Sequence, residues 1–167
     1  MIRNANAVDI PAILLLLVEC YGRSHYAKAG VVQVDVMHTK KLLLMAIHRD
    51  DHKTENACWI QVIENSGQIC GLMLATMARV YVIGDRLMAT DVLFVANGLA
   101  QPHEAGQLIK NMIQWAKRSP ACIEVRCGAT AVIEDPERTA RLFERFGMKP
   151  YGTMHRMEFE RTTTCQA

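Results

Sequence analysis

The strongest constraint on the fold is a strand–helix–strand pattern in the second half of the chain. Residues 88–95 and 123–127 are apolar runs typical of strands, and residues 102–117 between them have the spacing of an amphipathic helix. Strands joined in this way run parallel in one sheet, because the crossover helix returns the chain to the starting edge. We therefore predict two parallel strands that diverge at their C-terminal ends.

Further helices are predicted before and after this unit. Asp9 followed by Pro11 is typical of a helix start, and a second helix is expected over residues 35–48. Residues 135–137 indicate the cap of a last helix, with Gly147 as the C′ residue just beyond its end. In the first of these helices the face expected to be buried consists of Ile10, Ile13, Leu14, Leu17, Val18 and Tyr21.

The remaining apolar runs predict more strands. Residues 58–63 and 68–77 flank the turn sequence Asn-Ser-Gly and indicate a hairpin, while residues 1–4 and 151–159 indicate a first and a final strand. Residues 22–33 are predicted to form a loop. The element order favours an α/β (α+β mixed) fold, in which a central mixed sheet of about six to seven strands is flanked by about four helices.

Composition limits the class of protein. The 167 residues suit one domain, expected over residues 1–160 with residues 161–167 as a tail. A net charge of +2 gives no strong attraction to nucleic acid or to an anionic membrane, and the longest apolar run, residues 13–18, is too short to span a bilayer. The six cysteines form no C-x-x-C pair, so reduced structural thiols in a cytoplasmic protein are expected.

Three segments carry a resemblance to a known family. They are residues 2–13, which contain Ile-Arg-Asn-Ala and Asp-Ile-Pro-Ala-Ile; residues 141–148, Arg-Leu-Phe-Glu-Arg-Phe-Gly-Met; and residues 95–105 followed by Leu108 and Ile109. In order and spacing they resemble the first strand and helix, the late helix and the cofactor-binding strand–loop–helix of the GCN5-related N-acetyltransferases (GNAT). The resemblance covers nearly the whole chain, and the sequence is similar in style to relatives encoded by bacteriophages.

The resemblance implies direct transfer of an acetyl group from acetyl-CoA to an amine. In this family the thioester lies where the two parallel strands separate, and the pyrophosphate lies on a helix N-terminus, whose unpaired N–H groups favour an anion. Carried over to this sequence, the backbone groups of Phe94 and Val95 would hold the acyl carbonyl and the pantetheine arm. Those of His103, Ala105 and Gly106 would hold the pyrophosphate.

The chain departs from the family pattern in the phosphate-binding loop and in the late helix. The family has Arg/Gln-x-x-Gly-x-Gly/Ala, against Ala-Gln-Pro-His-Glu-Ala at residues 100–105, where only Ala105 fits. Pro102 removes an N–H donor, and Glu104 brings a negative charge to the place of the diphosphate. Phe143, which we expect to be buried, stands where the family often has a tyrosine that protonates the leaving thiolate.

Two acidic residues on the central strands are candidates for catalysis. Asp91 is expected on the same face as residues 89, 93 and 95, where it is either a general base with a raised pKa or the partner of Arg86. Glu124 alternates with Arg126 on the next strand, and the two either point together toward the cleft or form a pair in solvent. The six histidines show no metal-ligand pattern, and no metal site is predicted.

Two functions of different class remain open from the sequence. The first is an acyl-CoA-dependent N-acetyltransferase that acts on an amine of a small molecule or a protein. The second is a catalytically silent relative that binds another protein, for example as a virion-associated accessory module. Glu104 distinguishes them, because its carboxylate turns away from the helix axis in a working enzyme and caps the helix donors, excluding anions, in a silent domain.

Overall fold

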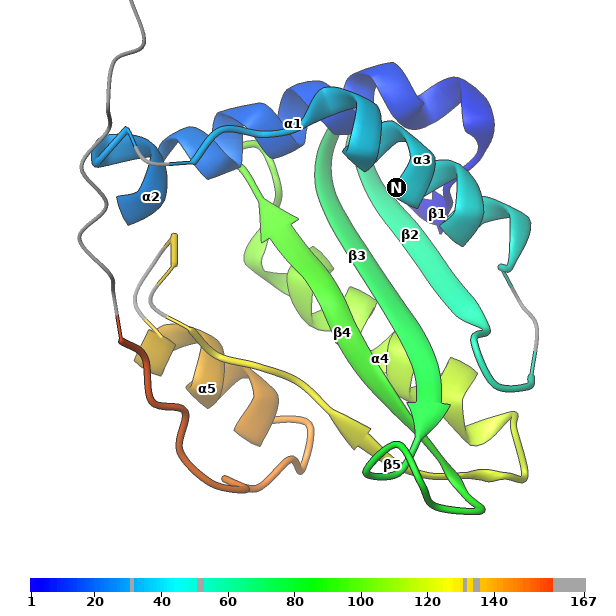
Figure 1. Cartoon of the computed structure of the whole chain (residues 1–167). Coiled ribbons are helices and arrows are strands. Elements are labelled where there is room, and N and C mark those ends of the chain that lie inside the picture. Colours follow the sequence, from blue (N-terminus) through cyan, green and yellow to red (C-terminus); the bar gives the residue numbers. More distant parts are fainter. Residues whose placement is uncertain (31, 51–52, 131, 134–135, 158–167) are drawn as a thin grey trace, which may run out of the picture.

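A five-stranded sheet forms the centre of the computed structural model, which describes residues 1–30, 32–50, 53–130, 132–133 and 136–157. In spatial order the strands are β1 (Ile2–Asn4), β2 (Cys58–Asn65), β3 (Gln68–Arg79), β4 (Leu87–Ala96) and β5 (Cys122–Arg126). Neighbouring strands from β1 to β4 are antiparallel, and β5 is parallel to β4 (Figure 1). The predicted parallel pair is therefore confirmed.

The helices of the described residues cover both faces of this sheet. They are the 3-10 helix η1 (Ala7–Asp9) and the α-helices α1 (Ile10–Gly22), α2 (His25–Lys28), α3 (Val36–His48), α4 (Pro102–Lys117) and α5 (Pro136–Glu144). α1 and α3 lie on one face, α4 lies on the other, and α5 lies beside β5 (Figure 1). Each face has its own apolar core, since successive β3 residues alternate: Leu72 packs with α1 and α3, and Met73 packs with α4.

The sheet is smaller than predicted. The described residues contain five strands rather than six or seven, and residues 151–157 form no strand. Pro150 and Gly152 disfavour a strand there, and the Tyr151 ring stacks on a side chain of β5 while its backbone stays out of the sheet. Residues 158–159 of the predicted strand lie outside the described residues, as does Asp135 of the predicted cap.

The segment predicted as a loop over residues 22–33 contains an additional helix. α2 forms there because the Ser24 hydroxyl accepts a hydrogen bond from the Ala27 N–H at 3.2 Å, which caps the first turn. The described α-helices are therefore five rather than about four. Across the described residues, none of the helices combines the length and the apolar character that crossing a membrane requires.

The start of α1 also differs from the prediction. The Asp9 side chain makes no cap bond to α1; its Oδ2 accepts the Asn6 N–H at 2.8 Å and lies 2.7 Å from Arg3 Nη1. Val18 was predicted on the buried face, but it is 47% exposed, because Cys20 and its neighbours on the inner face take the core positions. The helix nevertheless begins directly after Asp9, as predicted, and it ends at Gly22, the first residue of the predicted loop.

Candidate active site between the parallel strands

The pairing between β4 and β5 ends part-way along β4. The last pair of this ladder is Thr90 with Arg126. Residues 91–96 of β4 continue beyond it and, among the described residues, have no partner on β5. After β5 the chain moves away from β4 toward α5 (Figure 1). The predicted divergence is therefore confirmed. On the side of β4 that faces β5, it leaves main-chain groups outside the β4–β5 ladder, where an extended ligand can pair with them. Phe94 and Val95 lie in this segment.

A β-bulge at Val92 decides which side chains face this gap. Ala75 of β3 is opposite Asp91 and Leu74 is opposite Leu93, so Val92 is an extra residue on β4. Since Ala75 belongs to the core under α4, Asp91 lies on that face, whereas Leu93 lies on the face of α1 and α3. The prediction that Asp91 shares a face with the residues two and four places later is wrong, because the bulge reverses the alternation.

Asp91 lies at the point where the two strands separate. Its Oδ1 accepts a hydrogen bond from the Gly128 N–H at 3.0 Å, which ties β4 to the chain just beyond β5. Burial raises the pKa of the Asp91 carboxyl, and the Gly128 N–H opposes this shift. Burial, together with the Asp91 charge, raises the pKa of the neighbouring Cys127 thiol to about 12.

Two aromatic rings follow on the same face. Phe94 packs under α4 and α5, and its ring centroid lies 6.2 Å from that of Phe143. Phe143 is 5% exposed, so its predicted burial is confirmed. The face that carries Asp91 therefore continues into an aromatic wall that has no group able to donate a proton.

Glu124 and Arg126 lie on the opposite face of the β4–β5 junction. They are opposite Met88 and Thr90 in the ladder, whereas the intervening Val125 packs into the core under α4. Glu124 Oε1 lies 2.6 Å from Arg126 Nη2, with side-chain exposures of 33% and 26%. The two side chains thus point together and form a half-buried ion pair. The two candidate carboxylates of the site lie on opposite faces of the junction.

Arg126 is held between two tyrosine rings, a contact that was not predicted from the sequence. The guanidinium carbon lies 4.8 Å from the ring centroid of Tyr81, in the loop between β3 and β4, and 4.9 Å from that of Tyr151, which follows α5. The two hydroxyl oxygens lie 2.6 Å apart. Stacking of a cation on two aromatic faces restrains Arg126 and, through it, the carboxylate of Glu124.

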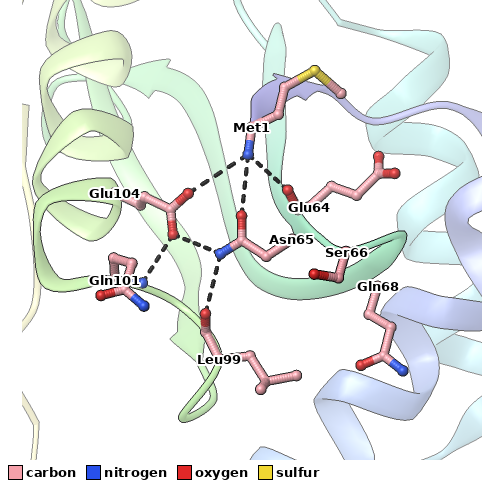
Figure 2. Close-up of a pocket in the computed structure, with 8 residues that line it drawn as sticks. All are labelled: Met1, Glu64, Asn65, Ser66, Gln68, Leu99, Gln101 and Glu104. Carbon is pink, nitrogen blue, oxygen red and sulfur yellow. Dashed lines mark hydrogen bonds and ion pairs between the residues drawn. The ribbon is translucent and has the colours of Figure 1, made fainter.

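The first turn of α4 carries a polar cluster on its side facing the β2–β3 turn (Figure 2). Glu104 Oε2 accepts the Gln101 N–H and an N–H of the Asn65 amide, both at 2.9 Å, and its Oε1 lies 3.6 Å from the Met1 amino nitrogen. The Gln101 bond is the main cause that lowers the pKa of Glu104. The carboxylate is 11% exposed at the side chain and borders a cavity of about 570 Å³ lined also by Leu99.

A second pocket lies on the other side of the same helix turn, between α4 and α5. Its volume is about 280 Å³. The lining residues are Pro102, His103, Gly106, Gln107, Lys110, Leu142, Arg145 and Phe146. Three of them are basic side chains, and Glu104 is not among the residues that line it. The negative charge of the first turn and the basic pocket are thus on different sides of α4.

Gly106 lets α4 approach the turn after α5 closely beside this pocket. A Cβ atom built on Gly106 would lie 3.1 Å from Cζ of Phe146, tighter than ordinary van der Waals contact. A glycine at this position therefore has a packing reason as well as the phosphate-binding role predicted for it.

Comparisons with known proteins agree at the level of the fold. No protein-family model and no curated protein matches the sequence. Glucosamine-6-phosphate N-acetyltransferase from Arabidopsis thaliana is 13% identical with a TM-score of 0.65, covering 96% of this chain and 98% of the other. Ribosomal-protein-alanine N-acetyltransferase from Brucella melitensis biovar Abortus 2308 is 17% identical with a TM-score of 0.63, covering 95% and 99%. The chain has the GNAT fold.

A further structure with this fold is named differently. A transcriptional regulator from Bacillus halodurans C-125 is 18% identical with a TM-score of 0.65, covering 95% of this chain and 99% of the other. The GNAT fold alone therefore does not specify the activity, and the residues of the site must decide it.

Within the GNAT fold, two of the three basic residues of the pocket, Lys110 and Arg145, were missed from the sequence, whereas His103 was predicted. Lys110 follows His103 by seven residues, two turns along α4, and this spacing could have placed it on the same helix face. Arg145 directly follows α5 and reaches the pocket only through tertiary packing, which no local pattern in the sequence indicates.

Proposed function

We propose that this protein is an acyl-CoA-dependent N-acyltransferase, which moves an acetyl group from acetyl-CoA to an amine by direct attack. One combination carries the proposal: residues 91–96 of β4 leave the ladder with β5, and the basic pocket lies at the start of the α4 helix that follows β4. An extended thioester donor needs both features, because its amide-containing arm pairs with main-chain groups and its phosphates need cations and N–H donors.

In this proposal the donor lies along β4 and ends at α4. The backbone groups of Phe94 and Val95 hold the acyl carbonyl and the pantetheine arm. The N–H groups of His103, Ala105 and Gly106 hold the pyrophosphate, at the positive end of the helix dipole.

The basic pocket supports a phosphate site despite the unusual loop sequence. Lys110 and Arg145 supply cations that the loop itself lacks. The Glu104 carboxylate accepts hydrogen bonds from Gln101 and Asn65 on the other side of α4, so its repulsion of a phosphate is weakened by distance and by these donors. Its bond to Gln101 caps one donor at the start of α4, as expected of the silent domain, so the basic pocket rather than the orientation of Glu104 supports the working enzyme.

The acceptor amine approaches from the other face of the junction. Glu124 lies there beside Arg126, on the face opposite the core under α4. A carboxylate in this place can accept the proton that the attacking nitrogen loses. The amine belongs to a small molecule or to a protein, and nothing in the described residues requires nucleic acid or a membrane.

Calorimetric titration with acetyl-CoA tests the donor site. We expect micromolar binding by the wild type and binding about tenfold weaker by the double variant Lys110→Gln, Arg145→Gln, because two phosphate contacts are lost. The matched control is Lys117→Gln, which removes a lysine from the last turn of α4 and should leave the affinity unchanged. Absence of binding at millimolar acetyl-CoA would reject the proposal.

That negative result would favour a protein-binding module instead. One observation supports this second candidate: Tyr81, Val82 and Ile83, at the tip between β3 and β4, are 63%, 83% and 89% exposed. Tyr81 and Val82 also have positive φ values of 50° and 69°, a conformation that is costly for a β-branched residue. Such a tip is a surface that a partner protein could cover.

A further inference from the structure

The proposed reaction needs a proton for the departing sulfur, and the aromatic wall beside the gap does not supply it. Phe143 has no acidic group, and Phe94 next to it has none either. The tyrosine hydroxyls of Tyr81 and Tyr151 lie with Arg126 on the opposite face of the junction. Among the described residues on the α4 face of this gap, the side chains that carry an acidic proton are Asp91 and Cys127.

We propose that the two carboxylates of the site divide the proton transfers, with Asp91 giving a proton to the sulfur on the α4 face and Glu124 taking one from the amine on the other. This inference rests on the proposed function, and it assigns to Asp91 the role of an acid rather than a base. Asp91 lies on the α4 face because it alternates with the buried Ala89, and the bulge at Val92 places Phe94 on that same face.

The surroundings of Asp91 suit an acid. Gly128 donates its N–H to Oδ1 and so orients the carboxyl group, which can carry its proton on Oδ2. Burial raises the pKa of Asp91, so the protonated form persists to higher pH than in water. Cys127 is also close, but a thiol with a pKa of about 12 is too weak an acid for this step.

The chemistry balances without any further reactant. The amine nitrogen forms a bond with the carbonyl carbon of the thioester, and the bond between that carbon and sulfur breaks. The proton lost by nitrogen passes to Glu124, and the sulfur takes the proton of Asp91 to leave as a thiol. Exchange with water after product release returns both carboxyl groups to their starting states.

The sharpest variant is Asp91→Asn, because an amide oxygen can still accept the Gly128 N–H while the acidic proton is lost. Its matched control is Asp85→Asn, which removes an exposed carboxylate from the loop before β4. The first measurement is the calorimetric affinity for coenzyme A relative to desulfo-coenzyme A, which lacks only the sulfur. We expect Asp91→Asn to change this ratio about threefold or more, and Asp85→Asn to leave it unchanged.

The second measurement is release of coenzyme A with hydroxylamine as the acceptor, using acetyl-CoA and its selenoester analogue. A selenolate leaves without protonation, so we expect Asp91→Asn to slow the thioester reaction about 100-fold and the selenoester reaction far less. An equal loss with both donors, or an unchanged affinity ratio, overturns the assignment of Asp91. A wild-type protein that binds neither coenzyme A nor its desulfo analogue, or that binds acetyl-CoA without any transfer, contradicts the proposed function itself.

Discussion

The two sides of the sheet differ in how completely their strands are paired and buried. β2 pairs with β3 along its whole length, with one register shift after Ile63, and the central β3 residues Leu72, Met73 and Leu74 are at most 1% exposed. β4 and β5 share a short parallel ladder, and none of the β5 residues is fully buried. This difference indicates that β1 to β3 contribute most of the buried core, while the β4–β5 junction leaves main-chain groups and carboxylates accessible.

The largest expected effect that tests this difference between the two sides of the sheet is on the free energy of unfolding. Leu72→Ala should lower the free energy of unfolding by about 3 kcal/mol, because it opens a cavity in the core under α1 and α3. Ile123→Ala on β5, where the side chain is 61% exposed, should cost less than about 0.5 kcal/mol. Urea unfolding measures both. Equal losses would mean that the two sides contribute equally to stability.

The second effect concerns acid stability at the β1 end of the sheet. The hydrogen bond from Arg3 is the main cause that lowers the pKa of Asp9. This pair therefore stabilises the fold above the ordinary carboxyl pKa, and the contribution is lost as the pH falls through the lowered value.

We expect Asp9→Asn to be about 2 kcal/mol less stable than the wild type at neutral pH, with the two converging on acidification. Melting curves recorded from neutral to acidic pH measure this. A constant difference at all pH values would show that the charge of Asp9 is not responsible.

The third effect sharpens the description of the aromatic wall. Phe143→Tyr adds a hydroxyl to a nearly buried ring, so it should lower the unfolding free energy by about 1 kcal/mol. Acetyl transfer by the folded variant should stay unchanged or rise, because a phenol adds a second proton donor near the sulfur. Turnover and melting temperature are measured together, and a fall in turnover without loss of folding would contradict this view.

The smallest effect is expected at Glu104. Its carboxylate lies on the side of α4 away from the basic pocket, so Glu104→Gln should tighten acetyl-CoA binding by less than about threefold, and most at low salt. Glu144→Gln, which removes an exposed carboxylate at the end of α5, is the control. A gain of tenfold or more would show that Glu104 repels the phosphates in spite of its orientation.

Much of the fold could be predicted from local signals. Gly147 was predicted as the glycine just beyond the last helix, and it has a φ of 81° in the turn that follows Glu144, the last residue of α5. The start of α3 was predicted from Asp35, whose Oδ1 accepts the His38 N–H at 2.8 Å. The parallel pair followed from the crossover around α4. These features depend on a few neighbouring residues, and the sequence states them directly.

The site was less predictable because it depends on tertiary pairing. The prediction that Asp91 shares a face of β4 with residues 93 and 95 was wrong, because a bulge can be recognised only once the partner strand is known. The stacking of Arg126 between Tyr81 and Tyr151 joins three segments far apart in the chain. A final strand was predicted from the apolar composition of residues 151–159. Pro150 directly precedes this segment, and none of its described residues joins the sheet next to β5.

The extra residue at Val92 has a consequence for tracing the ancestry of this chain. In an uninterrupted strand, an acidic and an aromatic residue on one face are two places apart, but here Asp91 and Phe94 are three places apart. A comparison that admits no gap at this point would align Leu93 with the aromatic position and score a mismatch. Distant homologues without the insertion should therefore carry the same pair of residue types with one residue fewer between them.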